Sequence, residues 1–233
     1  MIVMPANSTG WLFHCLARET GRIGHLYSPN HQRGPWSWLP YAMDNGAFTC
    51  WNQKENTFDW KKWKPLEDDW RRLLLWADCS GQEPMWAIVP DVPGQKDPTL
   101  EQWSKHAKIV HGFGWPAALA VQDGMTKADV HALDPVPDVI AVGGTTEWKW
   151  DKVAYWARFF PRVHVLRCNR PGKLEWLEEI GIESCDGTGW NRGDRKQTEG
   201  LEKWARSKGT PRFDALTPYV CRQPKDKNQI TFA

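Results

Sequence analysis

The stretch AALAVQDGMTKADVHALDPVPDVIAVGG (117–144) contains two short apolar runs, each closed by turn-forming or polar residues, with a helical segment over 126–133 between them. This order of strand, helix and strand is typical of parallel strands joined by a crossover helix. The same pattern extends along the chain in both directions. Eight apolar runs of this kind lie at 1–5, 22–29, 41–46, 85–91, 117–124, 139–144, 163–168 and 182–187.

Segments with helical spacing lie between most of these runs, and Pro65 to Asp78 is the clearest, with Pro in the first turn and one apolar stripe. Further helices are expected over 98–110, 126–133, 147–159, 171–180 and 199–207, and an irregular loop over 30–40. Eight strands favour a closed barrel over an open doubly wound sheet, which would more often carry a Gly-rich phosphate turn. We therefore predict an α/β fold, a single (β/α)8 TIM-type barrel over 1–223, followed by a polar tail over 224–233.

Composition limits the function. The 233 residues carry 30 Lys and Arg against 28 Asp and Glu, so any nucleic-acid contact must be a local patch. The 17 Trp residues suit a buried core and base stacking equally well. There is no secretory signal and no long apolar segment, which predicts a cytoplasmic protein without a membrane partner. Six scattered cysteines with no CxxC pair predict reduced thiols and no metal site. No cofactor is expected.

Polar residues follow the strands at the rim where barrel enzymes carry their active sites. They are Asp44, Asp91, Gln122, Gly143, Gly144 and Asp186. Each one alone could be an ordinary turn residue. Three carboxylates and an amide on one rim, however, can supply acid, base and nucleophile for chemistry at an anomeric carbon. A glycoside or a nucleoside is the indicated substrate.

Five segments carry a family resemblance: MDNGAF (43–48), VPDVPG (89–94), AVQDG (120–124), AVGGT (141–145) and VHVLRCNRPGKLEWLEEIGIESCDGTGWNRGDR (163–195). In order and spacing they resemble the tRNA-guanine transglycosylase superfamily. This superfamily includes queuine tRNA-ribosyltransferases and phage or bacterial enzymes that insert 7-deazaguanines into DNA. The resemblance covers about residues 41–195, and the last segment is the most specific.

The resemblance implies a role for each rim residue. Asp186 matches the nucleophile that attacks C1′ and holds the sugar covalently, and Asp44 matches the general acid/base. Asp91 matches the residue that reads the N1–H and 2-amino donors of guanine. Gly143, Gly144 and Gln122 fall at the 6-oxo group. Phe48 and Leu166 fall at the two faces of the base, although periodicity alone would equally place these two in the core.

The resemblance and the composition also suggest contacts to nucleic acid. Arg192 and Arg195 match residues that hold phosphates, and Arg167 and Arg170 lie at the same rim. The segment 58–72 interleaves tryptophans with Lys61, Lys62 and Lys64, although an amphipathic helix with Trp70 facing the barrel accounts for the same pattern. His164 is expected to be a satisfied interior residue.

Two departures from the family affect the expected polymer. The tRNA-modifying members carry a CxCxxC motif and a distant His that hold zinc, whereas this chain has only Cys221 in that region and is much shorter. A compact barrel without a zinc subdomain looks more like the phage-type DNA enzymes, which would act in the host cytoplasm. Replacing guanine with 7-cyano-7-deazaguanine would shield DNA from nucleases that read N7.

The expected function is therefore guanine exchange in DNA, with a flipped-out guanosine and a free 7-deazaguanine as partners. Three alternatives remain open. The same exchange can act on tRNA, a glycoside hydrolase can use Asp44 and Asp186 on an oligosaccharide, or the chain can bind nucleic acid without catalysis. The sequence does not indicate the oligomeric state.

Overall fold

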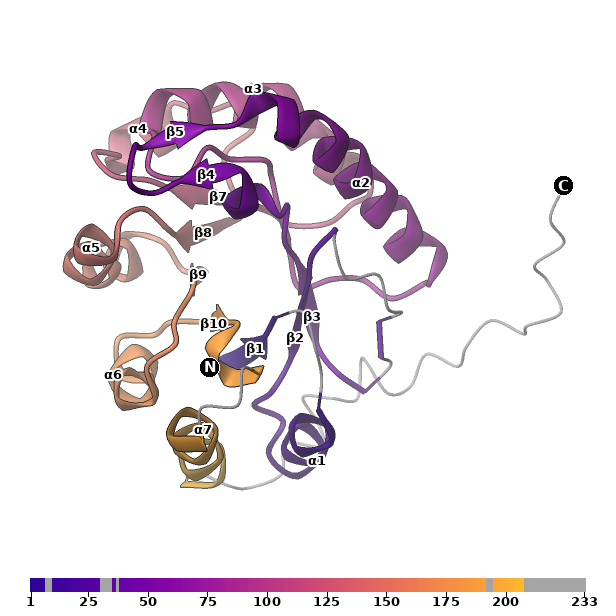
Figure 1. The fold of residues 1–233 in the computed structure, drawn as a ribbon, viewed down its shortest axis with the longest axis vertical. Coiled ribbons are helices and arrows are strands. Elements are labelled where there is room, and N and C mark those ends of the chain that lie inside the picture. Colours follow the sequence, from indigo (N-terminus) through magenta and orange to yellow (C-terminus); the bar gives the residue numbers. More distant parts are fainter. Residues whose placement is uncertain (7–9, 30–34, 37, 192–194, 208–233) are drawn as a thin grey trace, which may run out of the picture.

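The computed structural model describes residues 1–6, 10–29, 35–36, 38–191 and 195–207, and within them it shows a barrel of parallel strands (Figure 1). Its strands are β1 (Ile2–Pro5), β2 (His25–Tyr27), β3 (Tyr41–Met43), β6 (Ala87–Ile88), β7 (Ala117–Val121), β8 (Val139–Val142), β9 (Val163–Val165) and β10 (Ser184–Gly187). The eight strands follow the order β1-β10-β9-β8-β7-β6-β3-β2, and every hydrogen-bonded pair is parallel. Parallel bridges from Val3 to Ile23 and from Ala6 to Leu26 join the two ends of this order. The predicted (β/α)8 fold is confirmed, with one strand in each of the eight apolar runs.

Helices surround the strands on the outside of the barrel (Figure 1). They are α1 (Trp11–Thr20), α2 (Trp60–Cys79), α3 (Lys96–Gly112), α4 (Lys127–His131), α5 (Thr146–Phe159), α6 (Leu174–Glu179) and α7 (Arg195–Ser207). Three 3-10 turns, η1 (Ala47–Cys50), η2 (Pro171–Lys173) and η3 (Gly189–Asn191), lie between these elements, and a short antiparallel hairpin is formed by β4 (Trp51–Asn52) and β5 (Thr57–Phe58).

Two apolar layers hold the fold together, and the alternation of side chains along each strand assigns residues to them. In β7, Ala118 and Ala120 point into the barrel, where they join a cluster that includes the fully buried Trp86. Leu119, one position away, points outward into the layer between strands and helices. Trp70 is also buried in this outer layer, as the helical pattern of 58–72 suggested. Small residues inside the barrel leave room for the large Trp86 side chain.

The start of α2 differs from the prediction. The sequence placed it at Pro65, but the helix begins at Trp60 because the Asp59 carboxylate accepts hydrogen bonds from the backbone N–H groups of Lys61 and Lys62 at 3.0 Å each. A capping carboxylate satisfies donors that the first turn leaves free. Pro65 therefore lies inside the helix.

Other elements agree with or add to the expected set. The predicted helices over 98–110, 126–133, 147–159, 171–180 and 199–207 correspond to α3, α4, α5, η2 with α6, and α7. Helix α1 and the hairpin of β4 and β5 were not predicted individually. The described residues of the 30–40 segment form no helix, as expected for a loop.

Several further expectations concern the chain as a whole. The cysteines within the described residues are all free thiols. In the described ranges, no helix combines the length and the apolar character needed to cross a membrane. Arg192, Cys221 and the tail over 224–233 lie outside the described residues.

Candidate active site

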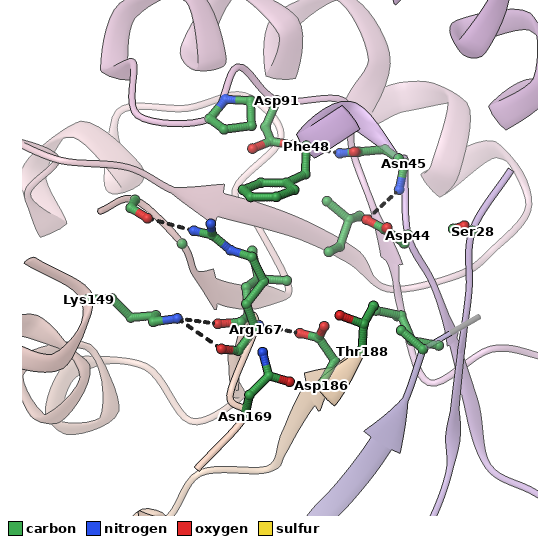
Figure 2. A pocket seen from close by; sticks show the side chains of 18 of the residues that line it. Ser28, Asp44, Asn45, Phe48, Asp91, Lys149, Arg167, Asn169, Asp186 and Thr188 are labelled. Atoms are coloured by element: carbon green, nitrogen blue, oxygen red, sulfur yellow. Dashed lines mark hydrogen bonds between the residues drawn. The ribbon is translucent and has the colours of Figure 1, made fainter. Parts of the chain in front are cut away.

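A cavity of about 590 Å³ lies at the carboxyl ends of the barrel strands (Figure 2). Strand geometry explains why polar side chains enter it, since residues two apart share a face. Ala42 and Ala120 point into the barrel, so Asp44 and Gln122, two positions further along, point to the same interior at its upper end. The predicted residues that line the cavity are Asp44, Phe48, Asp91, Gln122, Gly143, Gly144, Leu166, Arg167, Arg170 and Asp186.

Asp186 is buried and held at one carboxylate oxygen. Its Oδ1 accepts the backbone N–H of Arg167 at 2.9 Å and lies 3.1 Å from Nε2 of His164. The other ring nitrogen of His164 lies 2.8 Å from the Ser184 hydroxyl, which fixes the ring. Both of these contacts are to Oδ1, and no described residue hydrogen-bonds the second carboxylate oxygen, Oδ2. An oriented carboxylate with one oxygen uncommitted is suited to nucleophilic attack.

Asp44 has a different environment, because burial raises its pKa to about 7. The negative charges of Asp186 and Asp91 contribute to this increase, while backbone N–H groups of Gly46 and Asn45 oppose it. The Asn45 N–H donates to Oδ1 of Asp44 at 2.9 Å. A carboxyl with a pKa near neutrality can both release and take up a proton, which general acid–base chemistry requires.

Asp91 is held at both oxygens by side-chain amides. Nδ2 of Asn45 donates to Oδ1 at 2.8 Å, and Nε2 of Gln122 donates to Oδ2 at 2.7 Å. Burial raises the pKa of Asp91 to about 6, while the Asn45 hydrogen bond and the Arg167 charge favour the ionised form. A carboxylate oxygen accepts more than one hydrogen bond, so Asp91 can still receive two adjacent donors from a ligand.

Gln122 and two glycines form the wall beside Asp91. Oε1 of Gln122 accepts the N–H groups of Gly94 at 2.8 Å and Gly144 at 3.0 Å. The Gly144 N–H, which the resemblance placed at the 6-oxo group, is therefore bonded to Gln122 in this structure. Gly144 has a φ of +70°, and a Cβ there would lie 2.3 Å from a carboxylate oxygen of Asp123. Glycine is thus required here by backbone conformation and by space.

Phe48 and Leu166 meet the cavity in different ways. Phe48 is 43% exposed, so it is not a core residue, and its ring carries the Arg167 guanidinium with Cζ 4.4 Å from the ring centroid. Leu166 is partly buried and packs against the apolar cluster inside the barrel. Both expectations for Leu166, as part of the interior and as a surface facing the ligand, are therefore compatible with its position.

Asn45 and Lys149 are among the residues of the site that were not predicted from the sequence. Asn45 links Asp44 to Asp91, and Lys149 donates from Nζ to the carbonyl oxygens of Leu166 at 2.7 Å and Arg167 at 3.3 Å. Burial lowers the pKa of Lys149 to about 8. Asn45 stands directly beside a singled-out aspartate, whereas nothing in the sequence separates Lys149 from the exposed lysines of other helices.

His164 is interior and hydrogen-bonded, as expected, and its partner is the proposed nucleophile. The ring packs against Trp86, with centroids 4.5 Å apart, and the side chain is fully buried. No functional role was predicted for His164 from the sequence. The sequence does contain a signal for this residue. His164 lies two positions before Leu166, on the strand next to β10.

The predicted nucleic-acid contacts are spread more widely. Arg170 is exposed at the cavity mouth, with Cζ 5.7 Å from the Trp150 ring. Lys61, Lys62 and Lys64 are exposed in the first turns of α2, and Lys62 donates to the carbonyl of a cavity-lining residue, Thr49. Arg195 does not line the cavity. It is exposed on α7 and paired with Glu199, Nε to Oε1, at 2.6 Å.

Within the ranges that the structure describes, no group of three His, Cys, Asp or Glu side chains could hold a metal ion. Comparison of the chain with protein-family models and with curated proteins finds no match.

Proposed function

We propose that this chain is a base-exchange transglycosylase that replaces guanine in DNA with a 7-deazaguanine, such as 7-cyano-7-deazaguanine. The observation that carries the proposal is the arrangement of three carboxylates in one cavity, each with a different set of partners. Asp186 is oriented for attack, Asp44 has a pKa of about 7, and Asp91 is held open as a double acceptor. Displacement at an anomeric carbon needs a nucleophile and an acid with separate environments.

In the first half-reaction, Oδ2 of Asp186 attacks C1′ of the flipped-out deoxyguanosine. A bond forms between this oxygen and C1′, the bond from C1′ to N9 breaks, and its electron pair leaves with guanine. Asp44, protonated, donates its proton to the departing base. The products are a deoxyribosyl ester of Asp186, an ionised Asp44 and free guanine.

In the second half-reaction, a free 7-deazaguanine takes the place of guanine. Ionised Asp44 accepts the proton from N9 as N9 attacks C1′, and the ester bond to Asp186 breaks. Asp186 regains its negative charge and Asp44 its proton, so the protein returns to its starting state. The reaction consumes no cofactor, because one glycosidic bond is exchanged for another.

Base recognition follows from the acceptors of Asp91. Guanine and its 7-deaza analogues present N1–H and the 2-amino group side by side, and adenine lacks this pair. Each Asp91 oxygen already accepts one amide hydrogen bond, which fixes the plane of the carboxylate. A fixed acceptor pair discriminates strongly against a base with unmatched groups, because burying an unpaired polar group costs about 1–3 kcal/mol.

The choice of DNA rests on the sequence resemblance to the compact, zinc-free members of the superfamily. The exposed cations near the mouth, Arg170 and Lys62 among them, suit contacts to a polynucleotide backbone. A base must leave its stack to reach Asp186, at a cost of a few kcal/mol that such contacts offset.

The test is incorporation of labelled guanine and labelled 7-cyano-7-deazaguanine into double-stranded DNA, single-stranded DNA and tRNA in parallel. Asp186→Asn is the inactive variant, and Asp68→Asn, an exposed carboxylate on α2, is the matched control. We expect label in DNA with the wild type and Asp68→Asn, and none with Asp186→Asn. Label in tRNA alone would assign the chemistry to tRNA. Release of sugar from oligosaccharides without any exchange would favour the glycoside hydrolase.

A further inference from the structure

We propose that Arg167 occupies the nucleobase slot of the free protein and that a phosphate of the bound polynucleotide draws it out, so that free base binds well only after the nucleic acid. This inference rests on the proposed function and adds an order of binding to it. Arg167 comes from the end of β9, and Figure 2 shows its side chain reaching toward the Phe48 ring.

The guanidinium occupies two surfaces that are expected to contact a base. Its carbon lies 4.4 Å from the Phe48 ring centroid, within stacking distance. Nη2 of Arg167 donates to the carbonyl of Gly144 at 2.6 Å, so the guanidinium lies against the wall that Gly144 and Gln122 form. A flat group with in-plane donors that stacks on Phe48 and bonds this wall competes directly with a base for the same surfaces.

Charge holds Arg167 in this position. Burial lowers the pKa of the Arg167 guanidinium, and the attraction of four carboxylates opposes this shift, in decreasing order Asp186, Asp91, Asp123 and Asp44. The inward position therefore has a physical cause in the free protein, since it places a cation among acidic groups. The phosphates of a bound polynucleotide offer stronger, bidentate acceptors to the same guanidinium.

The contacts that fix the backbone of Arg167 are independent of its side chain. Its N–H donates to Asp186 at 2.9 Å, its carbonyl accepts from Lys149 at 3.3 Å, and its φ is +56°. A non-glycine residue with this φ is uncommon and needs surrounding contacts to maintain it. Rotation of the side chain alone can therefore empty the slot without disturbing the oriented carboxylate of Asp186.

The experiment measures binding of 7-cyano-7-deazaguanine by calorimetry to the wild type and to Arg167→Ala. The measurement is made with and without a duplex that carries an abasic site, which supplies phosphates but no competing base. For the free proteins we expect Arg167→Ala to bind the base about tenfold more tightly, because the competing occupant is gone. The abasic duplex should tighten binding to the wild type and have little effect on Arg167→Ala.

Arg158→Ala is the matched control, because Arg158 lies over the Phe159 ring at 5.7 Å and does not line the cavity. It should bind the base as the wild type does. Arg167→Ser, which also removes the cation, carries the same comparison should the alanine variant fail to fold. Equal or weaker base binding by the Arg167 variants in the absence of DNA would overturn the inference and leave the proposed function standing. No binding of the base to any of these proteins, with or without DNA, would overturn the proposed function and the inference together.

Discussion

Asp44→Asn should stabilise the fold at alkaline pH, and the size of the effect follows from the environment of the carboxyl. Burial, together with the charges of Asp186 and Asp91, raises the pKa of Asp44 to about 7 in the folded protein. The unfolded chain has an ordinary Asp pKa of about 3.9. Because the folded state holds the proton more tightly, ionisation of Asp44 destabilises the fold as pH rises from about 4 to about 7.

The magnitude is a difference of about three pKa units at about 1.4 kcal/mol each. Wild type should therefore lose about 1.5 kcal/mol of its unfolding free energy at pH 5 and about 4 kcal/mol at pH 8, relative to pH 3 or below, through this group alone. Asparagine does not ionise, and its side-chain oxygen can still accept the N–H of Asn45, which Asp44 accepts at 2.9 Å. The variant should avoid this loss.

Urea unfolding at pH 5 and pH 8 measures the effect, with Asp68→Asn as the control for loss of an exposed carboxylate. The stability of Asp44→Asn relative to wild type should increase by about 2–3 kcal/mol between the two pH values. A relative stability that does not change with pH, or that changes equally in Asp68→Asn, would refute the reasoning. The measurement needs no substrate, so it tests the electrostatics of the cavity separately from the proposed chemistry.

Three further predictions concern the reaction. The rate of guanine release should fall about tenfold per pH unit above 7, because only protonated Asp44 can act as the acid. A single-turnover rate that stays constant from pH 6 to 9 would show that Asp44 is not the acid. Asp91→Ala should weaken binding of guanine and relax discrimination against adenine, and unchanged selectivity in competition assays would count against its reading of the base edge. His164→Phe should lower kcat about tenfold or more at unchanged KM, since Asp186 loses the contact at 3.1 Å, and His164→Gln should recover part of it. Equal losses in kcat for both His164 variants would mean that the ring serves packing only.

The barrel could be predicted because its strands are short, apolar and separated by clear turn residues. The runs 117–124 and 139–144 each end in polar or glycine residues, and the structure places these ends at the same rim. The alternation of side chains along each strand then predicts which residues enter the site. Asp44, Gln122 and Asp186 point into the cavity because they continue the inward faces of their strands.

The partners of the site residues could not be predicted, because they depend on contacts between distant segments. Asn45 reaches Asp91 across 46 positions of sequence, and Lys149 becomes buried only because its helix lies against the end of β9. Arg195, in contrast, was predicted as a site residue but does not line the cavity. The resemblance implied a phosphate contact near the reacting nucleotide, whereas in this structure Arg195 pairs with Glu199 on the exposed surface of α7.

The helix over 60–79 shows how a local signal can mislead. Pro65 is well suited to a first helical turn, so the sequence placed the helix start there. The Asp59 carboxylate caps two backbone N–H groups further upstream and moves the start to Trp60. This shift brings Lys61, Lys62 and Lys64 into the first turns of the helix and leaves them exposed.

The covalent step through Asp186 is the central claim, and a denaturing gel tests it most directly. The protein is incubated with an end-labelled duplex in the absence of free base and quenched in detergent. We expect a labelled band at the mass of protein plus DNA strand, discharged by adding 7-cyano-7-deazaguanine before the quench. Asp186→Asn should give no such band while still shifting the duplex on a native gel. The same covalent band in Asp186→Asn, or base exchange by the wild type with no covalent species, would contradict the account.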